Sequence, residues 1–438
     1  MVRVVLTYLA YCAVYTCRKP VSVVKPTLEA ELGFATSALA GIDSAWLVAY
    51  AIGQFCLGAT RSVFSGRAIV ASAFALTGIT TAACASCRTE TAFALAWGLN
   101  GFFQASINPL LVLFVADSLP PSRRASGVGL WQTSQQVGGV FANLMAASLL
   151  AHRGWQPIFL RGGLLVLCFA PLTYFALTSP KLVAPLASPV KSQKKKRFSF
   201  FFKGKRRQEE EEIVSVPEEV KVTMTMPGVK ATCLAYFCVK MTRYCLMFWL
   251  PFFLARAAHM PVAAAARTAT WLDVGGVLGS VAAGVVADRV FKGAMLKTCG
   301  PFALLASFFL VVLGFGYDRG ASLKNSLLMF LVGFCVAAPD GVLGGAAAKN
   351  ICDYNRAHDA KLPAAVSGLI NGCGSLGAIL QGLATAALVA KFGWQALFLT
   401  LATLMAIASL FLLPAIQLEA QYLSDHQEKQ QQQQQGTP

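Results

Sequence analysis

Twelve long apolar segments constrain the fold of this chain more than any other feature of its sequence. An α-helix needs about 20 mostly apolar residues to cross the hydrocarbon core of a bilayer. Because lipid offers no water to free backbone groups, only helices and closed barrels span membranes, and these segments lack the alternation of barrel strands. We therefore expect an all-α integral membrane protein with twelve transmembrane helices. The segments run at about 3–25, 41–60, 66–87, 91–115, 126–151, 157–177, 229–254, 267–287, 295–316, 323–348, 363–390 and 394–415.

The composition agrees with this class and changes the meaning of a large net charge. Hydrophobic residues make up 56% of the chain and charged residues only 13%, whereas about 25% of a typical soluble domain is charged. The formal net charge of +17 would suggest nucleic-acid binding in a soluble protein. Much of the excess positive charge lies in one run of residues between the sixth and seventh segments. We therefore expect a topological signal there, or contact with anionic lipid headgroups, and no nucleic-acid partner.

Composition also divides the chain into four parts. Residues 1–178 and 229–416 each hold six apolar segments. The linker 179–228 carries basic and acidic runs, and the tail 417–438 is rich in glutamine. Their low hydrophobicity predicts disorder, although the linker can be partly helical at the membrane surface. Lys and Arg are concentrated in the loops on the side of Arg3, which places both termini in the cytoplasm.

The targeting signals leave the choice of membrane open. No small-residue cleavage site follows the first apolar segment, and we expect no cleavable signal peptide. The chain is expected to be a multi-pass protein of an endomembrane, such as the endoplasmic reticulum, or of the plasma membrane. We also expect it to be a monomer.

The two sets of six segments are copies of one unit. Residues 7–26 and 232–251 align without a gap, and the matched pairs include Arg18 with Arg243. A second repeat, Gly-Trp-Gln, follows the fifth segment and the eleventh. Two six-helix halves joined by a long loop resemble the layout of major facilitator transporters. In such folds the substrate site lies near the membrane midplane, between the halves.

A pair of arginines inside these apolar segments is the main functional signal. A charge at the centre of a membrane helix costs about 2.5–3.5 kcal/mol and usually marks a pathway. The repeat places Arg18 and Arg243 at equivalent positions, and neither segment carries a nearby acid. We expect both guanidinium groups to face one cavity, where their fork of donors matches phosphate oxygens. The open alternative is an internal ion pair with Asp43, Asp273 or Asp340.

Neighbouring side chains extend this candidate site. Lys19 follows the first arginine directly, and Lys240 precedes the second by three residues. For both lysines, substrate contact and lining of a wet vestibule are equal alternatives. Tyr11 and Tyr15 lie seven and three residues before the first arginine and so share its helix face. They either bond the substrate or pack in the core.

Charged turns predict a gate. Asp288 and Arg289 close the eighth segment, in the kind of turn that major facilitator proteins use as a cytoplasmic gate. The counterpart after the second segment keeps Arg61 and Arg67 but has no acid. We predict gating roles for all four residues.

The motifs Tyr11-x3-Tyr15-x2-Arg18-Lys19 and Arg243-Tyr244-x4-Trp249-x-Pro251 resemble those of the organophosphate:phosphate antiporters within the major facilitator superfamily. The resemblance covers nearly the whole chain except the linker and the tail. It implies that the two arginines hold a phosphate group and that the two tyrosines line the same pocket. It also implies a small substrate, such as a sugar phosphate or glycerol 3-phosphate.

The chain departs from this family at two polar positions. Gln54, one turn after Tyr50, replaces a lysine of the family's second helix, and Gln135 replaces a histidine found in bacterial members. We predict that both glutamines bond the organic part of the substrate. Tyr50 is counted with them as a substrate-binding candidate.

The predicted function is transport by alternating access, with a phosphate ester exchanged for inorganic phosphate. Two alternatives remain: a carrier of another small organic anion, and a receptor that binds hexose phosphate without transporting it. We expect no enzymatic activity, because no Ser-His-Asp set or nucleotide loop is present. Cys84 and Cys87 have metal-like spacing but no second ligand pair. We therefore predict no metal and no cofactor.

Overall fold

A computed structural model describes residues 2–59, 63–120, 124–177, 223–291, 293–345, 347–355 and 362–435. Every regular element in these residues is helical. The N-terminal half contains α1 (Val2–Val14), η1 (Tyr15–Cys17), α2 (Pro20–Leu32), α3 (Thr36–Ala59), α4 (Gly66–Cys84), α5 (Glu90–Gln104), α6 (Ile107–Ser118), α7 (Arg124–Gln132), α8 (Ser134–Arg153) and α9 (Gln156–Ala176). The C-terminal half contains α12 (Val229–Arg256), α13 (Val262–Arg289), α14 (Met295–Gly316), α15 (Leu323–Gly344), α16 (Ala347–Tyr354), α17 (Leu362–Phe411) and α18 (Leu413–Gln435).

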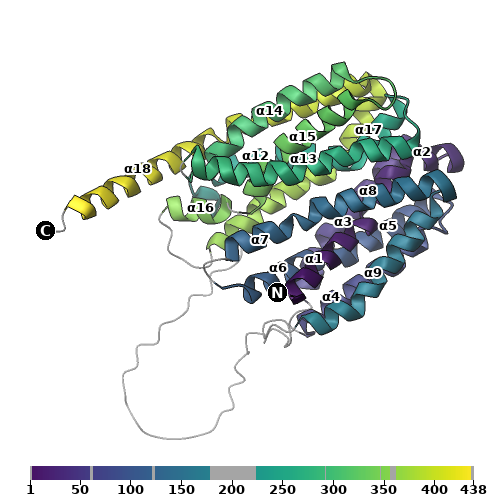
Figure 1. Ribbon diagram of the computed structural model, residues 1–438, viewed down its shortest axis with the longest axis horizontal. Coiled ribbons are helices and arrows are strands. Elements are labelled where there is room, and N and C mark those ends of the chain that lie inside the picture. Colours follow the sequence, from purple (N-terminus) through teal and green to yellow (C-terminus); the bar gives the residue numbers. More distant parts are fainter. Residues whose placement is uncertain are drawn as a thin grey trace, which may run out of the picture.

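The helices form an all-α membrane bundle of two halves that lie side by side (Figure 1). Eight of the described helical stretches are long and apolar enough to cross a membrane. Some of the twelve predicted segments are divided, such as the fifth between α7 and α8. The eleventh and twelfth are merged in α17, where Gly393 breaks the helix with a φ of 77°. Only glycine adopts this backbone conformation readily.

The first predicted helix is interrupted at the functional motif. Instead of running through 3–25, α1 ends at Val14, the 3₁₀ turn η1 follows, and α2 begins at Pro20. Pro20 stands at the first position of α2 and has no N–H to donate to the turn before it. Arg18 lies at the end of η1 with φ −119° and ψ −38°, and its side chain leaves the chain at a break rather than along a regular helix.

Close packing by glycine supports this break. Gly162 of α9 approaches the carbonyl of Thr16, and a Cβ at position 162 would lie 2.6 Å from that oxygen. Thr16 Oγ1 and Cys17 Sγ both donate to the Gly162 carbonyl, at 3.3 and 3.4 Å. Gly138 of α8 makes a similar backbone approach to Cys12. Small residues at helix contacts allow such approach in membrane proteins.

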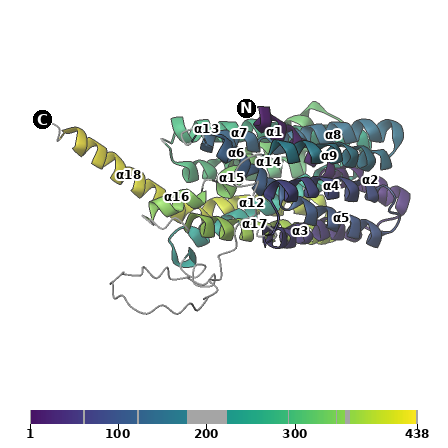
Figure 2. The same cartoon turned by 90° about the horizontal axis from the view of Figure 1, so that it is seen from below.

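The described contacts between the two halves include the end of the bundle that holds α2. Their main contacts join α2, α3 and α8 to α12, α13 and α17, whereas α1, α6 and α7 pack mainly within their own half. Lys25 Nζ donates to the Phe248 carbonyl at 3.0 Å, and Arg256 pairs with Glu29. Both contacts lie beyond the arginines along the chain, near α2, which both views place at the end opposite to α18 (Figure 2).

The C-terminal tail is helical, so the prediction of disorder is wrong as far as Gln435. Glu419 anchors α18 to the bundle. Its two carboxylate oxygens accept hydrogen bonds from the backbone N–H groups of Leu296 and Lys297 at the start of α14, and Tyr354 donates to it at 2.8 Å. Free N–H groups at a helix N-terminus favour such a carboxylate. Most of the predicted linker, up to residue 222, lies outside the described residues.

Candidate functional site

Arg18 is buried in a setting of aromatic and amide groups. Its side chain is enclosed, with only 5% of the residue exposed. Nε donates to Gln104 Oε1 at 3.1 Å and Nη1 to the Tyr15 hydroxyl at 3.4 Å. The guanidinium carbon lies 5.0–5.5 Å from the ring centres of Tyr15, Trp46 and Tyr50. Aromatic faces attract a cation most strongly where water is absent. Among the described residues, no carboxylate contacts Arg18.

Two buried amides that the sequence interpretation missed fix this arrangement. Gln104 Nε2 donates to the Cys17 carbonyl at 3.1 Å and to Asn100 Oδ1 at 2.5 Å. Trp46 Nε1 donates to the same Asn100 oxygen at 3.1 Å. With its nitrogen committed, Gln104 presents its oxygen to Arg18. In the sequence, the sign of this arrangement is a pair of amide side chains, four residues apart, inside an apolar segment.

Arg243 is paired with an aspartate. Its Nε lies 2.9 Å from Asp340 Oδ2, and the two side chains are 13% and 21% exposed. The expectation that both arginines lack a carboxylate partner is therefore wrong for Arg243, and the alternative of an internal ion pair is correct there. Asp340 lies on α15, and sequence alone could not show which way that helix faces. For Arg18 the expectation agrees with the described contacts.

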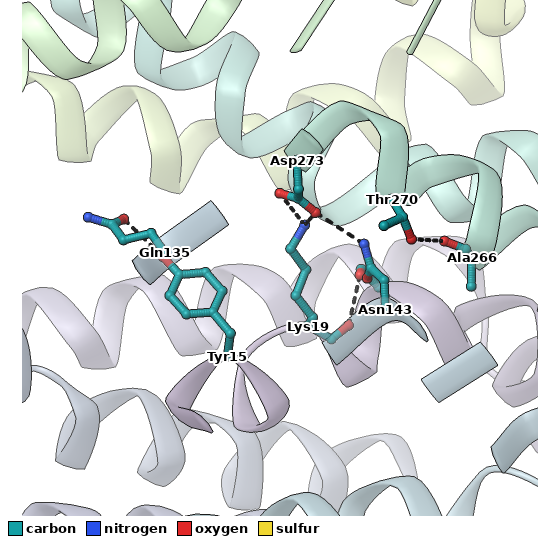
Figure 3. Close-up of polar contacts among 8 residues, drawn as sticks. Tyr15, Lys19, Gln135, Asn143, Ala266, Thr270 and Asp273 are labelled. Carbon is teal, nitrogen blue, oxygen red and sulfur yellow. Dashed lines mark hydrogen bonds and ion pairs between the residues drawn. The ribbon is translucent and has the colours of Figure 1, made fainter. Parts of the chain in front are cut away.

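Lys19 forms an ion pair across the two halves. Its Nζ lies 2.8 Å from Asp273 Oδ2 and 3.1 Å from Oδ1, and Asn143 also donates to Oδ2, at 3.1 Å (Figure 3). Both charged side chains are nearly enclosed. A Cβ at Gly139 would lie 2.9 Å from the Asp273 carboxyl carbon, so glycine makes room for this carboxylate. Lys19 is therefore not a free cation in this arrangement.

Lys240 lies on the other half among aromatic rings. Its Nζ is 5.0 Å from the ring centre of Tyr236 and 6.0 Å from that of Tyr244. The side chain is partly exposed, and its stem packs on Gly374, where a Cβ would lie 2.8 Å from the lysine Cδ. Within the described part of the chain, Lys240 forms no ion pair.

The two tyrosines of the first helix have different surroundings. Tyr11 is 2% exposed and stacks on Trp131, with ring centres 5.1 Å apart. This favours core packing for Tyr11. Tyr15 donates from its hydroxyl to Gln135 Oε1 at 2.9 Å (Figure 3). Because it also accepts from Arg18, it links Gln135 to the buried cation.

The two substrate-binding candidates of the second predicted helix, Tyr50 and Gln54, also have different surroundings. Tyr50 stacks on Trp46, with ring centres 5.1 Å apart, and lies beside Arg18. Gln54 is exposed one turn farther along α3 and contacts neither arginine. Tyr50 therefore belongs to the surroundings of the buried cation, whereas a substrate contact for Gln54 stays a prediction.

The arginines of the two halves share their neighbours. Tyr15 of the N-terminal half and Tyr244 of the C-terminal half each lie close enough to both Arg18 and Arg243 for the two positive charges to act on their hydroxyl groups. The structure therefore brings the two repeat-related arginines into one cluster, as the repeat predicts. We call Arg18, Arg243, Lys240, Tyr15 and Tyr244 the cation cluster.

The four residues predicted to form a gate make few described contacts. Asp288 and Arg289 are exposed at the end of α13 and form no ion pair with any described residue. The Arg67 guanidinium lies 4.9 Å from the ring centre of Tyr174. Arg61 lies outside the described residues. The gating roles stay a prediction.

A family model described as the Major Facilitator Superfamily matches residues 7–360. The chain belongs to the Major Facilitator Superfamily. Solved structures agree with this major facilitator fold. A bacterial homologue of the human lysosomal transporter Spinster, in an inward-facing and unoccupied conformation, matches with a TM-score of 0.65 at 15% identity and 97% coverage of both chains. The nucleoside transporter NupG matches with a TM-score of 0.68 at 14% identity, covering 94% of this chain and 98% of its own.

Curated relatives of this major facilitator protein are similar over most of its length. "Putative glycerol-3-phosphate transporter 1" of Arabidopsis thaliana is 25% identical, over 95% of this chain and 87% of the relative. "Sugar phosphate exchanger 3" of Gallus gallus is 25% identical, over 89% of this chain and 81% of the relative. "Probable hexose phosphate transport protein" of Chlamydia pneumoniae is 25% identical, over 93% of this chain and 89% of the relative.

Proposed function

We propose that this protein carries a small phosphate ester across a membrane in exchange for inorganic phosphate. The observation that carries the proposal is Arg18, which is enclosed by rings and amides without a carboxylate partner among the described residues. A desolvated guanidinium of this kind favours an anion with several oxygens. The names of the relatives, which include glycerol-3-phosphate transporters and a sugar phosphate exchanger, support the same substrate class.

The cation cluster supplies donors from both halves. Arg18 directs Nε to Gln104 and one outer nitrogen to Tyr15, so further N–H donors remain for a phosphate. Arg243 Nε lies 2.9 Å from Asp340 Oδ2, and the outer nitrogens of this arginine are proposed to bind the anion. Tyr15, Tyr50, Gln135 and Lys240 are proposed to complete the site with hydroxyl, amide and ammonium groups.

Alternating access follows from where the halves are joined. Lys19 lies next to Arg18 and holds Asp273 of the other half. An anion bound at Arg18 attracts the Lys19 ammonium as well, and so weakens its ion pair with Asp273. The closed end of the bundle near α2 would then separate while the opposite end closes. A ligand shifts such an equilibrium only by its difference in affinity for the two states.

Orientation is part of the proposal. We propose that both termini face the cytoplasm, because Lys and Arg are concentrated in the loops on that side. Among the described residues, Lys25 with Phe248 and Arg256 with Glu29 join the halves at the other end, near α2. The arrangement would thus be closed away from the cytoplasm, with Arg18 to be reached from the cytoplasmic side.

The test is counterflow of labelled phosphate in proteoliposomes that contain the purified protein. Exchange requires phosphate or a phosphate ester on the far side, so uptake into anion-free vesicles should be slow. Equal uptake with and without an internal anion would contradict exchange. Preference for a carboxylate over every phosphate ester would instead favour a carrier of another organic anion.

A further inference from the structure

The ion pair between Arg243 and Asp340 changes the charge of the proposed site. It uses Nε of the arginine, and the side chains remain 13% and 21% exposed. The ion pair between Lys25 and Asp43, by contrast, is fully buried, with an Nζ–Oδ2 distance of 2.5 Å. The Asp340 carboxylate is thus partly accessible and lies directly beside a guanidinium of the cation cluster.

Two cations of the cation cluster have no carboxylate partner among the described residues. Arg18 is held by amide, phenol and ring contacts, and the Lys240 ammonium lies over two tyrosine rings. Neither has a carboxylate within ion-pair distance in the described part of the chain. Lys19 does not add to them, because Asp273 neutralises it. The cation cluster therefore carries two uncompensated positive charges. They belong to Arg18 and Lys240, and not to the repeat-related pair Arg18 and Arg243 that the sequence predicts.

We propose that Asp340 determines which anion charge the site accepts, a role that rests on the proposed function. A phosphate monoester carries a charge of about −1.5 to −2 at pH 7, which two uncompensated cations match. A bisphosphate brings further negative charge close to the Asp340 carboxylate. That carboxylate repels it at short range, where like charges are poorly screened. Asp340 is thus a specificity-determining residue that favours monoesters and disfavours bisphosphates.

The first test removes the negative charge of Asp340 and keeps the shape of its side chain. Wild-type and Asp340→Asn proteins are reconstituted in phosphate-loaded proteoliposomes, and uptake of labelled phosphate is inhibited with glucose 6-phosphate or fructose 1,6-bisphosphate. The measured quantity is the ratio of the two half-inhibitory concentrations, bisphosphate over monophosphate. The variant should lower this ratio by about tenfold or more, because one unit charge at an effective dielectric constant of about 20 changes affinity about tenfold even at roughly 12 Å. Asp340→Glu should keep the wild-type ratio.

Charge compensation separates specificity from a structural role. Lys240→Gln leaves one uncompensated cation and should raise the ratio. The double variant Asp340→Asn with Lys240→Gln regains two uncompensated cations, Arg18 and Arg243, and should return the ratio to near the wild-type value. A merely structural defect would not be repaired by a second substitution. Asp318→Asn removes an exposed carboxylate, 3.1 Å from Lys324, and serves as the matched control with no expected change.

The outcomes distinguish this inference from the proposed function. If the wild-type protein exchanges no phosphate, the proposed function fails. If it does, and Asp340→Asn leaves the ratio unchanged, the role of Asp340 is overturned. If Asp340→Asn is not recovered folded by gel filtration, Lys240→Gln tests the same charge balance. An unchanged ratio in that variant contradicts the inference, and a raised ratio supports it.

Discussion

Lys19 and Asp273 join the two halves of the bundle through a nearly enclosed ion pair, with Lys19 Nζ 2.8 Å from Asp273 Oδ2. Asn143 donates to the same carboxylate at 3.1 Å. Lys19 directly follows Arg18, the cation proposed to receive phosphate. One of the residues that join the halves is thus the covalent neighbour of the residue proposed to bind the anion.

This relationship predicts a strong effect of Asp273→Asn on stability. Removing one partner of a buried ion pair leaves an uncompensated charge and costs about 3–5 kcal/mol. The variant should unfold at a lower temperature in detergent, by tryptophan fluorescence. Adding Lys19→Gln to it should recover part of the loss. Lys324→Gln removes an ion pair whose side chains are 52% and 42% exposed, and should change stability by less than about 1 kcal/mol. Equal effects of the two single variants would contradict the assignment.

Gln104 should control the affinity of Arg18 for phosphate. Gln104→Leu removes the acceptor for Arg18 Nε and the donor to the Cys17 carbonyl. A hydrogen bond to a charged group contributes about 1.5–3 kcal/mol, so the KM for phosphate should rise by roughly tenfold or more. Gln104→Glu has nearly the same shape but places a carboxylate on Arg18, and should nearly abolish uptake. A Gln104→Glu variant with a wild-type KM would show that the charge of Arg18 does not matter.

The helix break at Arg18 should be sensitive to the size of residue 162. A Cβ at this position would lie 2.6 Å from the Thr16 carbonyl oxygen, so Gly162→Ala must shift the backbone of η1. We expect a destabilisation of about 1–3 kcal/mol and slower phosphate uptake. Gly129→Ala is the control, because no atom lies within 4 Å of its added Cβ and alanine favours a helix. Similar unfolding temperatures for the two variants would argue against the close approach.

The halves and the arginine pair could be predicted from sequence, because a repeat carries spatial information. Residues related by an internal symmetry occupy equivalent places in both halves, which is consistent with Arg18 and Arg243 sharing the neighbours Tyr15 and Tyr244. The pairing of Arg243 with Asp340 could not be predicted. It depends on how α15 is rotated about its axis, which an almost uniformly apolar segment does not reveal.

Local features were missed for a different reason. The break before Pro20 follows from the chemistry of proline, but hydrophobicity alone made the segment look continuous. The helical tail depends on Glu419, whose carboxylate binds the N-terminus of α14. The polar composition of the tail does not reveal this long-range contact. Gln104 and Asn100 carry no charge, so the high cost of a charge inside a membrane helix, which marks Arg18 and Arg243, does not mark them.

Phosphate exchange by Arg18→Lys tests the central claim most directly, because lysine keeps the charge and removes the planar fork of donors. Counterflow of labelled phosphate should fall by about 100-fold in this variant. Arg88→Lys, at an exposed arginine beside Trp155, should exchange at the wild-type rate. Wild-type exchange by Arg18→Lys, with a normal amount of folded protein in the vesicles, would contradict the account.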